Sequence, residues 1–295
     1  MSLTVSNTSN LRNPFAPFDP ALSAAFDANV NLAIAEDVGS GDHTGQLVPE
    51  NEHVKARVIV REQAVLCGAP WFEAVMARLD PRLRVEWKFG EGDPMQANDE
   101  VCRIEGPARA LLTAERGALN FLQLLSGVST ATRRYVDLIR DTRARILDTR
   151  KTLPGLRLAQ KYAVRVGGGM NQRLALYDGI LIKENHIAAA GGITAAVTAA
   201  IKLNAGVTIQ VEVESIDELG EALAAGATSI LLDNFTLDMM REAVMITARR
   251  AVLEASGGIN METVRAIAET GVDRISVGSL TKDIQAIDYS LRIIG

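Results

Sequence analysis

Apolar and polar residues follow two different patterns along the chain, and the change falls near the middle of the sequence. Asp19-Pro20 begins a predicted helix whose apolar residues recur at helical spacing as far as Ala33. Residues 54–104 contain four short runs typical of β-strands, separated by turn sequences. Helical spacing returns at 110–125 and again at about 130–141, which predicts two further helices.

From residue 146 onward, short apolar runs that each end in a polar residue alternate with segments of helix length. The runs are RILDTR (145–150), GILIKE (179–184), VTIQVEVE (207–214), TSILLD (228–233), RAVLEAS (250–256) and DRISVG (273–278). Strands joined by crossover helices are parallel, in an open doubly wound sheet or a (β/α) barrel. We favour the barrel, because candidate chemical groups lie at the carboxyl end of nearly every strand. A complete barrel needs about 250 residues, so residues 146–282 predict an incomplete α/β barrel.

Composition limits the class of protein further. The chain has 295 residues with 31 Lys and Arg against 36 Asp and Glu, whereas nucleic-acid binders are usually basic. The two cysteines form no CxxC pair and the three histidines no HxxxH pair, which argues against a zinc site and is consistent with a reducing compartment. No apolar run approaches the roughly 20 residues that cross a bilayer, and the polar start is unlike a secretory signal. We therefore predict a cytoplasmic α/β protein that binds neither nucleic acid nor membrane.

Positive charge is concentrated between residues 143 and 183. The basic residues there are Arg143, Arg145, Arg150, Lys151, Arg157, Lys161, Arg165, Arg173 and Lys183. Only two aspartates oppose these nine, so the segment carries +7 in a chain of net charge -5. A solvated helix face explains the three between 157 and 165 equally well. Arg150-Lys151 and Lys183 instead end predicted strands, and this placement indicates a site for an anionic ligand.

Carboxylates form a second set at the ends of three successive predicted strands: Glu212, Asp233 and Glu254. Period-2 alternation places Gln210 and Glu212 on the same face of their strand. These carboxylates either balance the basic residues only, or Glu212 and Asp233 help to bind Mg²⁺. Mg²⁺ prefers a few carboxylates together with substrate phosphate oxygens.

Glycine follows the last two predicted strands, in SGGI (256–259) and VGSL (277–280). Glycine lets the backbone approach a phosphate, and phosphate sites after the last two strands recur in barrels. No Ser/His/Asp or Cys/His set accompanies them. The residues alone therefore predict a site for a phosphorylated, multiply anionic ligand with Mg²⁺, which acts through electrostatics rather than a protein nucleophile.

Eight longer motifs stand in a fixed order along the chain. They are AEDVGSGDHT (35–44), AERGALNFLQLLSG (114–127), DTRKTLPGLR (148–157), KYAVRVGGGMNQRLALYDGILIKENHI (161–187), EVES (212–215), LLDNF (231–235), ASGGI (255–259) and VGSLT (277–281). Together they resemble the quinolinate phosphoribosyltransferase family. The resemblance implies a decarboxylating enzyme that joins quinolinate to phosphoribosyl pyrophosphate (PRPP) and makes nicotinate mononucleotide in NAD biosynthesis.

The polar composition of residues 1–18 predicts a flexible tail. The resemblance implies that residues 19–128 form an N-terminal α/β sandwich domain, completed by about 284–295. It implies that residues 129–283 form an open, about seven-stranded α/β barrel. It also implies a homodimer in which Arg116 of one subunit completes the site of its partner.

The resemblance also assigns roles, position by position, to residues of this chain. It implies that quinolinate binds to Arg116, Arg150, Gln172, Arg173 and Lys183. It implies that Lys151, Glu212 and Asp233 are catalytic, with Lys151 on PRPP and both carboxylates on its Mg²⁺. The loops Ser256-Gly257-Gly258 and Gly278-Ser279 are implied to hold the 5′-phosphate.

Gln172 departs from the family pattern, in which His usually precedes the Arg at this point. Glutamine donates a hydrogen bond to a carboxylate but cannot become cationic. We therefore predict weaker quinolinate binding, without loss of the chemistry.

Three other functions stay open at this point. One is a paralogous phosphoribosyltransferase on the same scaffold, specific for nicotinate or associated with molybdate transport. Another is a sugar-phosphate aldolase or epimerase, in which Lys183 forms a Schiff base. The third is a binding protein that has kept the pocket without catalysis.

Overall fold

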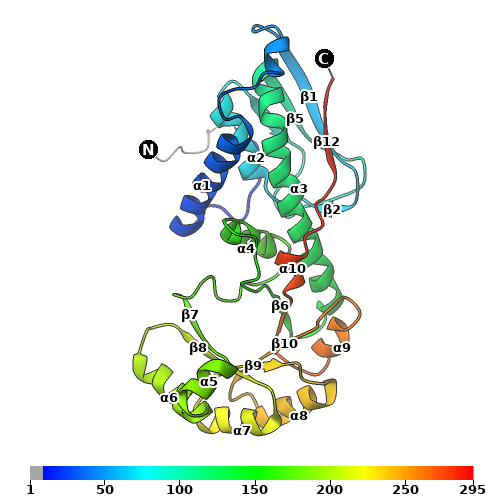
Figure 1. The fold of residues 1–295 in the computed structure, drawn as a ribbon. Helices are drawn as coiled ribbons and strands as arrows, with labels where there is room; N and C mark the ends of the chain where they lie inside the picture. The colour runs from blue at the N-terminus through cyan, green and yellow to red at the C-terminus, as the bar shows by residue number, and fades with distance from the viewer. Residues whose placement is uncertain (1–8, 295) are drawn as a thin grey trace. The chain divides into compact units, whose positions relative to one another are not determined.

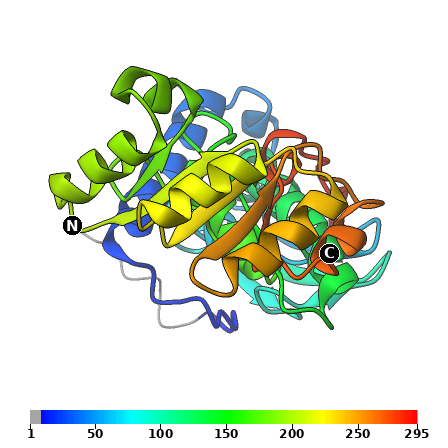
Figure 2. The same ribbon diagram turned by 90° about the horizontal axis from the view of Figure 1, so that it is seen from below.

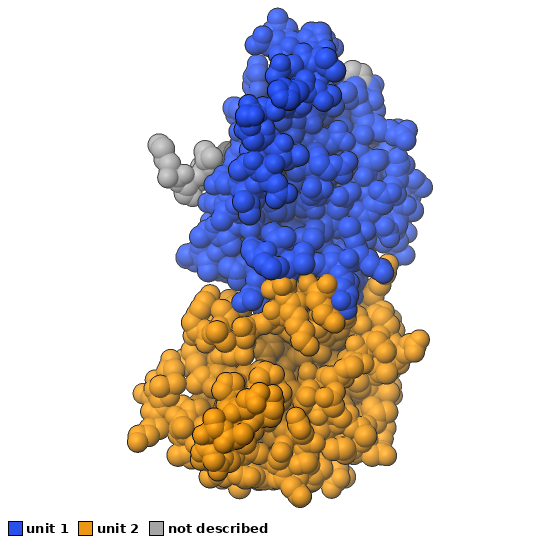
Figure 3. Space-filling model, in the orientation of Figure 1, with its two compact units in different colours: residues 1–131, 153–167, 283–295 blue, residues 132–152, 168–282 orange. Residues whose placement is uncertain are grey.

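The computed structural model describes residues 9–294, which belong to two compact units (Figure 3). Unit 1 contains the chain up to residue 131, residues 153–167 and the chain from 283 on, and unit 2 contains residues 132–152 and 168–282. The chain first passes from unit 1 to unit 2 between residues 131 and 132 and finally returns to unit 1 at residue 283. The segment 153–167, which we expected within the barrel, clusters with unit 1.

Unit 1 is an antiparallel sheet with helices, in the strand order β12-β1-β5-β3 (Figure 1). Its strands are β1 (His53–Val60), β3 (Arg84–Trp87), β5 (Glu100–Pro107) and β12 (Tyr289–Ile293), and a separate ribbon pairs β2 (Ala64–Val65) with β4 (Pro94–Met95). Its helices are α1 (Pro20–Asp37), the 3-10 turn η1 (Gly45–Leu47), α2 (Ala69–Leu79), the first part of α3 (Ala108–Ile139) and α4 (Arg157–Val166). Because β12 pairs with β1, residues near the carboxyl terminus complete this sheet.

The start of the described chain is packed rather than loose. Residues 1–8 of the predicted tail lie outside the described range, but Asn10 exchanges two hydrogen bonds with the backbone of Trp87, at 2.9 and 2.8 Å. The ring of Phe18 lies 5.6 Å from that of the fully buried Trp71. Asp19, at the predicted start of the first helix, caps α1, because its Oδ1 accepts the N–H of Leu22 at 2.9 Å.

Helix α3 is continuous over 32 residues, so our prediction of two helices with a break near residue 128 is wrong. Small residues in this stretch serve packing instead. Ser126 bonds to both the N–H and the carbonyl of Cys67, at 3.0 Å each. A Cβ at Gly127 would lie only 2.4 Å from the carbonyl oxygen of Gln285.

Helix α2 lies in the stretch for which only strands were predicted. Its inward residues Trp71, Phe72, Val75 and Met76 are almost fully buried, and Trp71 belongs to an aromatic cluster with Tyr162. Burial within this cluster stabilises the helix, although the two aromatic residues in its first turn have a lower helix propensity than alanine.

Unit 2 is a six-stranded parallel sheet in the order β6-β11-β10-β9-β8-β7. Its strands are β6 (Arg145–Leu147), β7 (Gly179–Ile182), β8 (Thr208–Val213), β9 (Ser229–Asp233), β10 (Val252–Ser256) and β11 (Arg274–Ser276). Its helices are the last turns of α3, α5 (Glu184–Ala190), α6 (Ile193–Leu203), α7 (Ile216–Ala224), α8 (Leu237–Thr247), α9 (Val264–Ala268) and α10 (Ser279–Lys282). Helices α6, α7 and α8 lie along one side of the sheet (Figures 1 and 2).

The strand order confirms the predicted open α/β barrel. The first strand, β6, pairs with the last, β11, and not with its successor β7, so the sheet curls and stays open between β6 and β7. At the place of a seventh strand the described residues show one isolated parallel bridge, between Leu147 and Met170.

In the part of the chain that the structure describes, no single helix is long and apolar enough to cross a membrane. The bent pair α5 and α6 passes such a test only when both helices are taken together.

Candidate active site

The predicted chemical groups of unit 2 gather where its parallel strands end. Lys183 directly follows β7, Glu212 is the penultimate residue of β8, and Asp233 and Ser256 are the last residues of β9 and β10. Arg150 and Lys151 follow β6 by three and four residues, and Gly278-Ser279 follows β11. Because parallel strands end at the same edge, the fold brings these predicted site residues to one side of the sheet.

Helix caps fix two of these strand ends. Ser215 caps α7 by accepting the N–H of Glu218 at 3.2 Å, and Thr236 caps α8 by accepting the N–H of Met239 at 3.2 Å. Each cap lies three residues after a predicted carboxylate, Glu212 or Asp233. Short capped turns limit the freedom of the strand ends that carry these carboxylates.

Lys183 and Glu212 form an ion pair across neighbouring strands. Lys183 Nζ lies 2.9 Å from Glu212 Oε2 and 3.3 Å from Oε1. The Glu212 side chain is 10% exposed and that of Lys183 44% exposed, so the pair lies at the border of the interior. The sequence analysis expects Lys183 to bind quinolinate and Glu212 to bind Mg²⁺. It does not predict that the two side chains contact each other.

Arg150 and Arg173 bring two positive charges together. Burial, and then the charge of Arg150, lower the pKa of Arg173 below its usual value, while Asp178 opposes the shift. Arg150 Nε is buried and has no hydrogen-bond partner. Two like charges with an unsatisfied donor are unfavourable unless an anion joins them, so this pair suits a carboxylate ligand.

The loop that carries Gln172 and Arg173 is held at both ends by carboxylates. The buried Asp148 accepts the backbone N–H of Gln172 at 2.9 Å and the amide of Asn171 at 2.6 Å. At the other end, Asp178 accepts the N–H groups of Leu174 and Ala175 at 2.7 Å. These two aspartates, which the sequence marks only as opposing charges, therefore position the loop.

The glycine loops make close approaches that a side chain would block. Gly257 has a φ of +98°, and a Cβ there would lie 2.1 Å from Asn234 Oδ1. A Cβ at Gly278 would lie 3.2 Å from Cδ of Lys151, so the Lys151 side chain runs past this loop. Gly258, at φ +61°, has open space at its Cβ position. A lysine beside an open glycine loop is an arrangement that suits a phosphate.

The prediction that Glu254 ends its strand is wrong. Glu254 lies in the middle of β10 and is fully buried. It accepts hydrogen bonds from Ser276 and from Gln210 Nε2, the latter at 2.9 Å. Gln210 in turn accepts from Gln172 at 2.7 Å. The period-2 alternation that places Gln210 on the same face as Glu212 was the one sequence feature that pointed to a role for Gln210 in these contacts.

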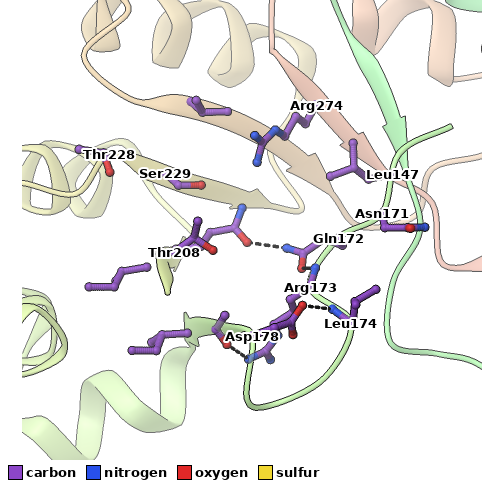
Figure 4. A pocket seen from close by; sticks show the side chains of 15 residues that line it. Leu147, Asn171, Gln172, Arg173, Leu174, Asp178, Thr208, Thr228, Ser229 and Arg274 are labelled. Carbon is purple, nitrogen blue, oxygen red and sulfur yellow. Dashed lines mark hydrogen bonds between the residues drawn. The ribbon is translucent and has the colours of Figure 1, made fainter. Parts of the chain in front are cut away.

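A cavity of about 470 Å³ opens at the opposite, amino ends of the strands (Figure 4). Its lining includes the first residues of five strands: Gly179, Thr208, Ser229, Val252 and Arg274. Of the predicted site residues, only Gln172 and Arg173 reach it. The carboxyl-end groups therefore belong to a different face of the barrel from this cavity.

Arg116 lies in α3 and belongs to unit 1. Its predicted role at the site of a partner subunit stays a prediction. Among the described residues, no group of three or more His, Cys, Asp or Glu is arranged to hold a metal ion by itself.

An open parallel barrel with basic, acidic and glycine-rich strand ends defines a barrel enzyme for anionic, phosphorylated ligands. The sequence and its relatives narrow this class. Residues 42–126 match the model of the quinolinate phosphoribosyl transferase N-terminal domain, and residues 128–292 match that of its C-terminal domain. The chain belongs to the quinolinate phosphoribosyltransferase family.

Individual relatives agree with this assignment. A probable nicotinate-nucleotide pyrophosphorylase [carboxylating] of Bacillus subtilis is 41% identical over 266 residues, which cover 90% of this chain and 92% of the relative. The solved nicotinate-nucleotide pyrophosphorylase of Francisella tularensis has a TM-score of 0.90 and 45% identity, and the match covers 92% of this chain and 96% of that one. The match to human nicotinic acid phosphoribosyltransferase covers 91% of this chain and 74% of that one, with a TM-score of 0.61. Because the sequence identity is only 14%, this match shows a shared fold alone.

Proposed function

We propose that the protein transfers the phosphoribosyl group of PRPP to quinolinate and releases pyrophosphate and CO₂, giving nicotinate mononucleotide in NAD biosynthesis. The observation that carries this proposal is the closeness of the Arg150 and Arg173 charges, together with a buried Arg150 Nε that has no hydrogen-bond partner. Quinolinate has two adjacent carboxylates, and two neighbouring arginine charges with an unsatisfied buried donor suit such a dianion. Membership of the family supports the same substrate.

In the proposed reaction, the cationic side chains hold quinolinate with its ring nitrogen toward C1 of the ribose. The nitrogen lone pair forms the N–C1 bond while the bond from C1 to the pyrophosphate oxygen breaks, with inversion at C1. The ring is then cationic, so the C2–carboxylate bond breaks, CO₂ leaves, and its electron pair enters the ring. A proton from water at C2 completes the product. Alignment of the two reactants supplies roughly 7–11 kcal/mol of such a barrier.

PRPP is proposed to bind at the glycine loops and Lys151. The loops Ser256-Gly257-Gly258 and Gly278-Ser279 take the 5′-phosphate, and Lys151, whose side chain passes Gly278, faces the pyrophosphate. The carbonyl of Lys151 accepts the hydroxyl of Thr281 at 2.9 Å, which fixes the backbone there. This arrangement stabilises the negative charge of the leaving group.

Glu212 and Asp233 fit a Mg²⁺ ion that is bound mainly through PRPP. They offer two carboxylates on neighbouring strands, and Mg²⁺ commonly takes one or two carboxylates plus substrate oxygens and water. When bound, the ion would neutralise charge on the departing pyrophosphate. The chain's own contribution is to hold the carboxylates in place, Glu212 through Lys183 and Asp233 through its 2.9 Å hydrogen bond from Asn234.

The active form is proposed to be a cytoplasmic homodimer in which Arg116 of one subunit contacts quinolinate in the other. Both cysteines, Cys67 and Cys102, are free and buried, which suits a reducing compartment.

Turnover assays test the function directly. With PRPP and Mg²⁺, we expect CO₂ release and nicotinate mononucleotide from quinolinate, and no nucleotide from nicotinate. Arg150→Ala should lower kcat/KM for quinolinate by about two orders of magnitude, because it removes a charged contact. Arg241→Ala, on the exposed surface, is the matched control and should leave kcat/KM unchanged.

The alternatives give different results in the same assay. Turnover of nicotinate without CO₂ release from quinolinate would show the activity of a paralogous phosphoribosyltransferase. Failure to release pyrophosphate with either substrate would indicate a binding protein. Near-normal turnover by Arg150→Ala would remove this arginine from the site.

A further inference from the structure

A network of buried amide and carboxylate groups crosses the interior of unit 2 beside the predicted quinolinate residues. The carboxylate of Glu254 accepts from Ser276 and from Gln210, whose Nε2 lies 2.9 Å from Glu254 Oε2. Gln172 Nε2 donates to Gln210 Oε1 at 2.7 Å, and this bond is the dashed line that ends at the amide of Gln172 in Figure 4. Gln172 Oε1 accepts the backbone N–H of Arg173 at 2.5 Å. The network thus joins β11, β10, β8 and the loop after Met170.

The Glu254 carboxylate determines which group donates and which accepts in every hydrogen bond of this network. A carboxylate only accepts, whereas an amide can turn either its oxygen or its nitrogen toward a neighbour. Because Gln210 must donate to Glu254, it presents its oxygen to Gln172. Gln172 must then donate to Gln210, and its own oxygen faces the N–H of Arg173.

Glu254 is a costly residue at this position. It is 0% exposed, and in the described part of the chain its hydrogen-bond donors are the neutral groups of Gln210 and Ser276. A buried carboxylate without an opposing charge is destabilising relative to an apolar side chain of similar volume. Fold stability alone therefore does not explain a carboxylate in the middle of β10.

We infer that Glu254 is a positioning residue for quinolinate, which acts through Gln210 to hold the Gln172 amide in a single orientation. This inference rests on the proposed function, because Gln172 and Arg173 are the predicted substrate contacts. An amide at position 172 needs such control, since its two ends have opposite hydrogen-bonding character. Turned around, the amide would point its oxygen at Gln210 Oε1 and its nitrogen at the N–H of Arg173, so both hydrogen bonds would be lost and the loop that carries Arg173 would lose this support.

Replacement of the carboxylate tests this role. Glu254→Met removes the acceptor, and we expect the KM for quinolinate and the Kd of quinolinate alone to rise about 5- to 30-fold. The KM for PRPP and kcat should stay within about twofold, because the network reaches only the quinolinate groups. Glu254→Gln can still accept from Gln210 and should show a smaller rise. Thr270→Val, which removes a buried 2.7 Å hydrogen bond elsewhere in unit 2, is the control and should change stability without changing KM.

A double-mutant cycle separates positioning from simple packing. If Glu254 acts through Gln210, then Gln210→Met also raises the KM for quinolinate, and adding Glu254→Met causes no further rise. Additive effects, or a loss of stability with unchanged KM, would overturn the inference. Glu254→Gln and Gln210→Met keep the test available if Glu254→Met does not fold. Absence of quinolinate turnover in the unaltered protein would instead refute the proposed function, so the two failures are distinguishable.

Discussion

The carboxyl group of Glu91 couples the stability of unit 1 to pH. It is 2% exposed, and it accepts the N–H of Ala69 and the hydroxyl of Tyr162, each at 2.7 Å. Burial raises the pKa of Glu91 from 4.5 to about 7, and the two hydrogen bonds only partly oppose the shift. The folded chain therefore binds this proton more tightly than the unfolded chain. The resulting stability is complete below about pH 4.5 and is lost as the pH rises through about 7.

Glu91→Gln, which is neutral at every pH, should remove this dependence. Relative to the variant, the free energy of unfolding of the unaltered protein should fall by about 2–3 kcal/mol between pH 5 and pH 8. Urea unfolding at both pH values measures the difference. Glu105→Gln, on an exposed carboxylate, should show no such trend. An equal trend in both variants would mean that burial of Glu91 is not the cause.

Single residues also show how far the sequence predicts the site. Strand ends were predictable, because an apolar run that stops at a charged residue marks an end, as at Lys183 and Asp233. Contacts across strands were not, because register depends on tertiary packing. The Lys183–Glu212 pair and the placement of Glu254 therefore came only from the structure. The weaker quinolinate binding expected from Gln172 stays a prediction.

At the scale of elements, α3 shows why glycine and serine were misleading. Small polar residues in a row are typical of a helix break, yet in α3 they allow close contact with neighbouring segments. Helical periodicity predicted the barrel helices well, because one face of each is apolar. The helix α2 was not predicted, because the stretch between two predicted strands was left unassigned, although its buried residues Trp71, Phe72, Val75 and Met76 have helical spacing.

Two glycines of α3 should respond in opposite ways to alanine. A Cβ at Gly117 would meet its nearest neighbour, Val75 Cγ1, at 3.7 Å, so Gly117→Ala should stabilise the protein by up to about 1 kcal/mol through helix propensity. A Cβ at Gly127 would lie 2.4 Å from a backbone oxygen, so Gly127→Ala should destabilise by about 1–3 kcal/mol. Thermal and urea unfolding of both variants test this. Stabilisation by both would show that α3 does not need the close approach at Gly127.

At the scale of the whole molecule, the order of segments reflects how each sheet is completed. The chain leaves unit 2 for residues 153–167, returns to it, and finally adds β12 to the sheet of unit 1. Pattern alone predicted the α/β class and the incomplete barrel, because a parallel sheet repeats its signature at every strand. The pattern could not place residues 153–167, since the amphipathic spacing of a helix such as α4 does not indicate which unit its apolar face packs against.

Arg116 ties the whole molecule to the proposed dimer, and complementation between inactive subunits tests it. Arg116→Ala and Arg150→Ala should each be nearly inactive as homodimers. In a mixed dimer, the subunit with intact Arg150 receives Arg116 from its partner, so one of two sites is complete. Because half of the dimers are mixed at equal expression, co-expression should restore about a quarter of full activity, measured as CO₂ release from quinolinate.

Pairing Arg150→Ala with Lys183→Ala provides the control. Both substitutions remove predicted contacts of the subunit's own site, so no mixed site is complete and no activity should return. If Arg116→Ala with Arg150→Ala also stays inactive, Arg116 does not act across a dimer interface.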